Sequence, residues 1–198
     1  RPQDDLTTAL VQAEEAGDKL SKEELEAMLF LLLFAGHETT VNLIGKGLLA
    51  LLENQDQLVM LKENTALIDS AIEEMLRYTS PVQQVAPRFP KEDVMLHNTL
   101  IPKGSRIMAI VPSANRDETV FEEPDKFDIT RSPNKHLAFG FGIHFCLGAP
   151  LARLEAKRAF QMLLAQYPDI RLAVPAEQLE WQGVFALRRL KALPVHLT

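Results

Sequence analysis

The residues with the clearest capacity for chemistry lie in the stretch 139–148, which reads FGFGIHFCLG and contains Cys146, the one cysteine of the chain. Its glycines permit unusual backbone angles and a close approach of backbone to a ligand. A helix is predicted to begin just after Cys146, and helix N-terminal amides stabilise a thiolate. The pattern favours a cysteinate that holds a metal from one side. A buried structural cysteine in a glycine-rich turn is the alternative.

A second polar group interrupts an apolar helical stretch, where residues 35–40 read AGHETT. Glycine costs about 1 kcal/mol in a helix interior, and a buried carboxylate or hydroxyl costs free energy unless it is satisfied. The combination predicts a dent in the helix at Gly36, with Glu38 and Thr39 facing a cavity. The alternative is a polar patch on a half-exposed helix.

A third signal is the pair Glu74 and Arg77, three residues apart and so on one face of a predicted helix. Such a pair is usually a surface salt bridge worth less than about 1 kcal/mol. Glu73 is an alternative partner for Arg77.

The elements that must position these residues follow from the prolines and the apolar pattern. No proline lies between Pro2 and Pro81, and seven of the twelve then fall between Pro81 and Pro133. Because proline breaks helix interiors, the first 80 residues should be mostly helical and the next 50 mostly strands, turns and loops. Ser21 and Glu24 form a capping box that starts a long helix over 21–53. The further expected elements are short helices at 58–61 and 68–78, strands at 94–96, 100–101 and 106–110, a helix over 147–167 interrupted early by Pro150, and short strands after 170.

Composition narrows the class of protein. The chain has 198 residues, 46% hydrophobic and 24% charged, which is typical of a soluble globular protein. Its net charge of −6, from 21 basic and 27 acidic residues, argues against a general nucleic-acid binder. A single cysteine excludes an intrachain disulfide and favours a reducing, cytoplasmic location. The longest apolar run, 27–35, has nine residues, whereas a membrane span needs about 20. The polar, acid-rich start does not read as a secretory signal.

The three signals occur together and in one order, and in this they resemble the cytochromes P-450, the heme-thiolate monooxygenases, of the soluble bacterial type. Three motifs of that family are matched. The ligand loop F-x-x-G-x-x-x-C-x-G is filled by Phe139, Gly142, Cys146 and Gly148, the oxygen-activating helix motif by Ala35 to Thr40, and the E-x-x-R motif by Glu74 and Arg77. The stretch from Phe121 through Pro124 to Phe127 is similar to the family's meander.

The resemblance implies a mainly α fold with small β-sheets (α+β), the C-terminal half of the cytochrome P-450 fold, in one domain over 1–198. Family members have about twice this length. The implied parts are a lead-in at 1–20, the long oxygen-activating helix at 21–53, the E-x-x-R helix at 66–79, strands at 82–111, the meander at 112–138, the heme-ligand loop at 139–148, a helix at 149–167 and strands at 170–198.

The resemblance also implies roles around a heme b. Cys146 is the expected axial thiolate, Phe139 packs beside its sulfur, and Glu38 and Thr39 deliver protons. The other implied cofactor contacts are Ala35, Gly36, Arg88, Gly142, His144 and Gly148, with Arg88 and His144 toward the heme propionates. An alternating geometry would place His144 on the same side as Cys146. The pair Glu74 and Arg77 is implied to be structural, with either Lys126 or Arg131 in the place of a family arginine. His136 is expected to be structural.

A small hydrophobic substrate is implied, with contacts from Leu33, Phe34, Val82, Val85, Val184 and Phe185. The implied electron donor is an acidic ferredoxin or flavodoxin that approaches Lys135, Arg153, Lys157 and Arg158. Two alternatives to the monooxygenase remain: a peroxide-driven peroxygenase, and a catalytically incompetent half-chain without heme. The apolar middle of the long helix predicts that such a half-chain either self-associates through that helix or is accompanied by its other half.

Overall fold

The computed structural model describes residues 3–15, 21–183 and 187–198. Two compact units are distinguished, Arg1–Glu38 and Thr39–Thr198. Helix α2 (Lys22–Glu53) begins in the first unit and ends in the second.

The first unit contains helix α1 (Leu6–Glu15) and the start of α2. The predicted capping box is confirmed, because Ser21 N–H donates to Glu24 Oε2 at 2.8 Å and Glu24 N–H donates to Ser21 Oγ at 3.2 Å. Large apolar side chains of this part of α2 are exposed, with Phe30 71% and Leu33 74% accessible. By length and composition α2 could cross a membrane, but a core helix of a soluble protein meets the same criterion.

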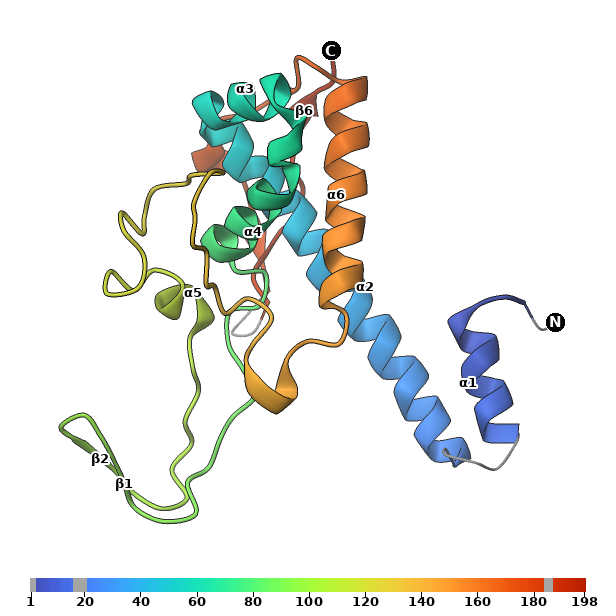
Figure 1. The fold of residues 1–198 in the computed structure, drawn as a ribbon, viewed down its shortest axis with the longest axis vertical. Coiled ribbons are helices and arrows are strands. Elements are labelled where there is room, and N and C mark those ends of the chain that lie inside the picture. Colours follow the sequence, from blue (N-terminus) through green and yellow to red (C-terminus); the bar gives the residue numbers. More distant parts are fainter. Residues whose placement is uncertain (1–2, 16–20, 184–186) are drawn as a thin grey trace. The chain divides into compact units, whose positions relative to one another are not determined.

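The second unit is built around helices (Figure 1). After α2 come α3 (Gln55–Glu63), the 3-10 turn η1 (Thr65–Leu67), α4 (Ile68–Thr79), the short α5 (Val111–Ala114), the 3-10 turn η2 (Gly142–His144) and α6 (Ala149–Gln166). Pro150 falls in the first turn of α6, where proline is favoured. The predicted interruption of the helix at Pro150 is therefore wrong.

In the described residues of this unit, three small antiparallel sheets of two strands each accompany the helices. They pair β1 (Val94–Leu96) with β2 (Thr99–Ile101), β3 (Arg171–Leu172) with β6 (Val195–His196), and β4 (Trp181–Gln182) with β5 (Arg189–Leu190). The 3-10 turn η3 (Ala176–Gln178) lies between β3 and β4. Within this unit, Figure 1 shows the β1–β2 hairpin at the tip of two extended segments, away from α3, α4 and α6.

The predicted strand at 106–110 is wrong as a continuous strand. This segment makes two isolated bridges, Arg88 with Ile107 and Gln84 with Ile110. The two bridges are four residues apart on one segment, from Gln84 to Arg88, but three apart on the other, from Ile107 to Ile110, so the pairing shifts by one residue between them and no continuous ladder forms.

The core of the second unit lies where the end of α2 meets α3, α4 and α6. Its fully buried side chains include Leu51, Leu58, Ile72, Met75 and Phe160. Gly47 allows the close approach of α2, because a Cβ there would lie 2.8 Å from Met75 Sδ and 3.2 Å from Phe160 Cζ. This packing sets the positions of α4, which carries the E-x-x-R pair, and of α6, which follows the cysteine loop.

Candidate active site

The cysteine loop is held by its own backbone. Cys146 N–H donates to Phe139 O at 2.9 Å, and Phe145 N–H donates to Gly142 O at 3.0 Å. Gly140 and Gly142 have φ of 73° and 71°, a left-handed conformation that favours glycine. The 3-10 turn η2 replaces the alternating geometry expected for His144, so the predicted placement of His144 on the side of Cys146 does not follow.

Cys146 is a free, exposed thiol, so a buried structural cysteine is the wrong interpretation. The large apolar side chains of the same loop are also exposed. Ile143 is 97%, Leu147 91% and Phe141 86% accessible. An accessible thiol within an apolar surface fits a flat, largely apolar macrocycle whose iron takes one thiolate ligand. In the described part of the chain no group of three or more His, Cys, Asp or Glu side chains is placed to hold a metal ion.

A charged cluster braces this loop from α4 and α6. Arg153 on α6 donates to both oxygens of Glu73 on α4, at 2.7 and 2.8 Å. The Arg153 guanidinium also lies 4.5 Å from the centre of the Phe139 ring. Because Phe139 O accepts the Cys146 N–H, Phe139 connects this ion pair to the backbone of the cysteine.

His136 completes the cluster. Its Nδ1 accepts the Ala138 N–H at 3.2 Å, which leaves Nε2 to donate to Glu73 Oε2, 3.1 Å away. Burial by itself raises the pKa of Glu73, but the hydrogen bonds from Arg153 and His136 outweigh it and lower that pKa to about 2. Glu73 is therefore ionised at neutral pH, and it pairs with Arg153 rather than with Arg77.

The E-x-x-R pair is fully buried, contrary to the usual surface pair. Arg77 makes two hydrogen bonds to Glu74, each 2.8 Å long. Its remaining donors reach three backbone carbonyls of the meander, those of Asn115 at 2.9 Å, Pro124 at 2.7 Å and Lys126 at 2.9 Å. All five guanidinium N–H groups have acceptors, which offsets the cost of burying the charge.

The structure also decides between Lys126 and Arg131. Arg131 Nε lies 3.2 Å from Glu74 Oε2, and its guanidinium donates to the carbonyls of Glu122, Glu123 and Lys126. The ammonium of Lys126 instead contacts Glu123 at 3.3 Å, in an exposed pair. Arg131 therefore completes the network, because its planar fork can bond a carboxylate and several carbonyls together.

The predicted residues of the oxygen-activating motif lie on α2. Every residue of α2 is α-helical, so the predicted dent at Gly36 is not a break in the helix. One glycine costs only about 1 kcal/mol, which a helix of this length tolerates. A Cβ at Gly36 would meet open space. Leu33, Phe34, Ala35 and Gly36 are exposed, whereas Glu38 and Thr39 are half-buried.

The predicted substrate and propionate residues have varied settings. Val82 and Val85 are half-buried on the extended segment after α4. Arg88 is exposed, and its guanidinium donates to the carbonyls of Ala86 and Pro87 at 3.1 and 3.4 Å. His144 is exposed, two residues before Cys146 in the sequence. The predictions for Val184 and Phe185 fall outside the described residues.

The basic cluster expected to receive an electron donor is partly neutralised. Arg153 is paired with Glu73, and the ammonium of Lys157 lies 2.8 Å from Asp69. Lys135 and Arg158 are exposed.

Two buried polar residues of this region were not predicted. The Asn115 amide donates to Ser80 Oγ at 3.0 Å and accepts the Leu137 N–H at 2.7 Å, which joins α5, α4 and the approach to the cysteine loop. Lys46 on α2 is also buried. Its signal in the sequence was a lone cation inside the apolar stretch 43–52, whereas no local pattern marks Asn115.

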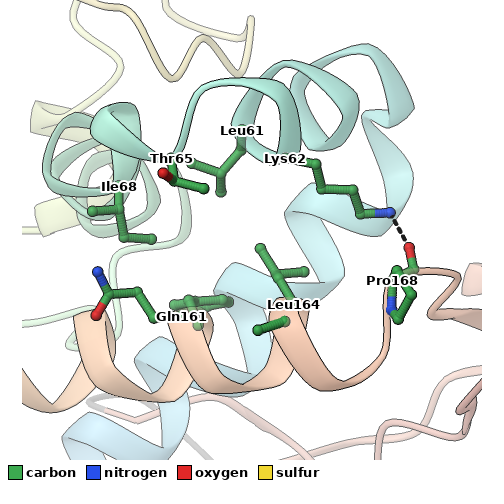
Figure 2. A pocket seen from close by; sticks show the side chains of 9 residues that line it. Leu61, Lys62, Thr65, Ile68, Gln161, Leu164 and Pro168 are labelled. Carbon is green, nitrogen blue, oxygen red and sulfur yellow. Dashed lines mark hydrogen bonds between the residues drawn. The ribbon is translucent and has the colours of Figure 1, made fainter.

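A cavity of about 490 Å³ lies between α3 and η1 on one side and α6 on the other (Figure 2). Leu61, Ile68, Phe160 and Leu164 make it largely apolar, and Lys62 closes one end by donating to Pro168 O. It shares no residue with the cysteine loop.

Comparison with known proteins agrees with this arrangement. The family profile described as Cytochrome P450 matches residues 1–179. The polyketide biosynthesis cytochrome P450 PksS of Bacillus subtilis is 52% identical over 198 residues, which are 100% of this chain and 49% of that protein. The cytochrome P450 monooxygenase PikC of Streptomyces venezuelae is 49% identical over 193 residues, 97% of this chain and 46% of that protein.

Solved structures show the same fold. The tirandamycin C-bound P450 monooxygenase TamI superposes with a TM-score of 0.94 at 45% identity, over 100% of this chain and 49% of that one. The chain thus spans about half the length of the relatives it matches. The exposed thiol in its glycine-rich loop, the buried Glu74–Arg77 pair and these matches together place the chain in the cytochrome P450 family.

Proposed function

We propose that the intact protein is a cytoplasmic heme-thiolate monooxygenase that acts on a small hydrophobic substrate. One atom of dioxygen enters a C–H bond of the substrate, and the other leaves as water with two electrons from a redox protein and two protons. The observation that carries the proposal is the exposed Cys146 thiol within an exposed apolar loop, which the half-buried Glu73–Arg153 pair braces and which follows the meander held by the buried Glu74–Arg77 pair.

Heme, when bound, would supply the oxygen-activating chemistry, and Cys146 is the residue proposed to hold it through its thiolate. The protein's part is to hold that thiolate and to exclude water from it. The Phe139 carbonyl fixes the backbone of Cys146, and the Phe139 and Phe145 rings, 6.3 Å apart, flank the loop. Arg88 and His144 are proposed to contact the propionates, since both are exposed cations or hydrogen-bond donors.

Proton delivery is assigned to Glu38 and Thr39, an acid beside an alcohol on α2. Leu33, Phe34, Val82 and Val85 are the proposed substrate contacts, and their apolar character fits a hydrophobic ligand. The electron donor is proposed to be an acidic ferredoxin or flavodoxin. Lys135 and Arg158 support this assignment, because they are exposed cations near the cysteine loop in the sequence and exposed basic residues steer an acidic partner.

The decisive test is the reduced carbon monoxide spectrum of the full-length protein and of its Cys146→Ser variant. The unsubstituted protein should show the red-shifted Soret band of a thiolate-ligated heme. The variant should lose that band, and a variant that keeps it would refute the assignment of Cys146. Gln178→Ala, on η3 and remote in sequence from the loop, serves as a control that should keep the band.

A further inference from the structure

Lys46 is a buried cation with an unusual set of partners. The residue is 7% exposed, and its ammonium donates to Thr79 O at 2.5 Å and Ser80 O at 3.3 Å. In the described part of the chain no carboxylate is paired with it. Burial, and then the charges of Arg188 and Arg116, lower the pKa of Lys46 to about 8. Burying a cation without a carboxylate partner costs several kcal/mol. The contacts of Lys46 must offset this cost.

The two carbonyls that accept from Lys46 form the C-terminus of α4, where a cation is favoured by the helix dipole. Ser80 is the C-cap, fully buried, with a left-handed φ of 40°. Its hydroxyl donates to Arg77 O at 3.1 Å and accepts from the Asn115 amide at 3.0 Å. Lys46 therefore ties α2 to the Thr79–Ser80 turn, which ends α4 and which Asn115 ties to α5.

The chain leaves this turn directly into the extended segment 81–88, which is weakly held. Its backbone bonds to the facing segment are Val111 N–H to Gln83 O at 2.9 Å, Val85 N–H to Ala109 O at 3.2 Å, and the pair between Arg88 and Ile107. With so few ladder bonds, the direction in which the segment leaves Ser80 decides where Val82 and Val85 lie.

Lys46 also lies seven residues after Thr39 on α2, so the two residues share one face of the helix. Helix α2, which carries Thr39, thus also binds the start of the segment that is proposed to line the substrate pocket.

We propose that Lys46 is a positioning residue for substrate: its ammonium fixes the Thr79–Ser80 turn to α2 and so sets the place of segment 82–88 relative to the Thr39 face. This inference rests on the proposed function for its substrate pocket, but the geometry of the turn stands on its own.

The test uses the intact heme-loaded protein with Lys46→Met, and Lys62→Met as the matched control. Lys62 also donates to a backbone carbonyl, that of Pro168, but it is outside this turn. Hydrogen exchange of the Val85 and Arg88 amides should speed up about tenfold in Lys46→Met, while the Phe160 amide on α6 changes little. Lys62→Met should leave Val85 and Arg88 unchanged.

A second readout uses two iron ligands as probes. Imidazole contacts little beyond the iron, whereas 4-phenylimidazole also reaches the pocket wall. The ratio of their dissociation constants should change about tenfold in Lys46→Met. If Lys46→Met does not fold, Lys46→Gln, which keeps a donor without the charge, takes its place.

Unchanged exchange at Val85 and Arg88, or equal acceleration at Phe160, would overturn the inference. Loss of the thiolate carbon monoxide band in the unsubstituted protein would instead overturn the proposed function, so the two failures are distinguishable.

Discussion

Two adjacent carboxylates on α4, those of Glu73 and Glu74, bind different parts of the structure. Glu74 is fully buried and binds Arg77 and Arg131, which tie α4 to the meander. Glu73 is partly exposed and binds Arg153 and His136, which brace the cysteine loop. A difference of one position turns a side chain by about 100° around a helix axis, so neighbouring acids serve separate parts of the site.

Glu73 makes the stability of this chain depend on pH. Its pKa falls from 4.5 to about 2 on folding, so its contribution is present above the unfolded value and is lost as pH falls from 4.5 toward 2. Glu73→Gln should lower the free energy of unfolding at neutral pH by about 1–2 kcal/mol, after allowance for partial exposure. It should also flatten the acid limb of the stability curve. Urea unfolding followed by circular dichroism at several pH values measures both.

The control for this prediction is Glu155→Gln, an exposed acid on α6. An acid limb as steep in Glu73→Gln as in the unsubstituted chain would contradict the role of Glu73.

The alcohol of the α2 motif leads to a second prediction. In the full-length protein, Thr39→Ala should keep the heme and its thiolate band but uncouple turnover, because reducing equivalents are diverted to peroxide when proton delivery is impaired. Peroxide formed and product formed per cofactor oxidised are the quantities to measure. Unchanged coupling would count against Thr39.

At the scale of elements, the spacing between α2 and its neighbours depends on a glycine. Gly47 lies against Met75 of α4 and Phe160 of α6, both fully buried. At Gly45, two residues earlier on the same helix, an added Cβ would meet open space. The two glycines therefore separate helix propensity from packing.

Gly45→Ala should stabilise the chain by up to about 1 kcal/mol, since alanine is the better helix former. Gly47→Ala should instead destabilise it by about 1–3 kcal/mol, because the methyl group overlaps Met75 and Phe160 in a packed core. Thermal unfolding of both variants tests the prediction. A gain in stability for Gly47→Ala would show that Met75 moves aside at no cost.

At the scale of the whole molecule, large apolar side chains are exposed in both units. Those of the cysteine loop lie in the second unit, and Phe30, Leu31, Leu33 and Phe34, each more than half accessible, lie on the part of α2 that belongs to the first unit. Contiguous apolar surfaces of this kind mark places where another molecule or chain segment binds.

A polypeptide of these 198 residues alone should therefore self-associate through α2. Sedimentation should give species larger than the 22.2 kDa of one chain, and Leu33→Glu should shift the distribution toward the monomer. Val59→Glu, an exposed apolar residue on α3, is the matched control. A monomer that carries stoichiometric heme would contradict this prediction.

The sequence by itself determined the long helix, its capping box, the E-x-x-R helix, the β1–β2 hairpin and the cysteine loop. Each of these features is set by residues that are close together in the sequence. Local propensity, capping and glycine placement are therefore enough to specify it. The three motifs also identified the family, because the ligand-loop motif is specific and the three occur together in one order.

Tertiary structure decided which side chains meet. The burial of Glu74 and Arg77, the choice of Arg131 over Lys126, the pairing of Glu73 with Arg153, and the grip of Lys46 on the Ser80 turn all depend on segments far apart in sequence. The predicted strand at 106–110 was wrong for the same reason, since its two bridges to the distant segment 84–88 are out of register by one residue. A buried polar group takes the partner that packing brings within hydrogen-bond distance, and no local pattern specifies that partner.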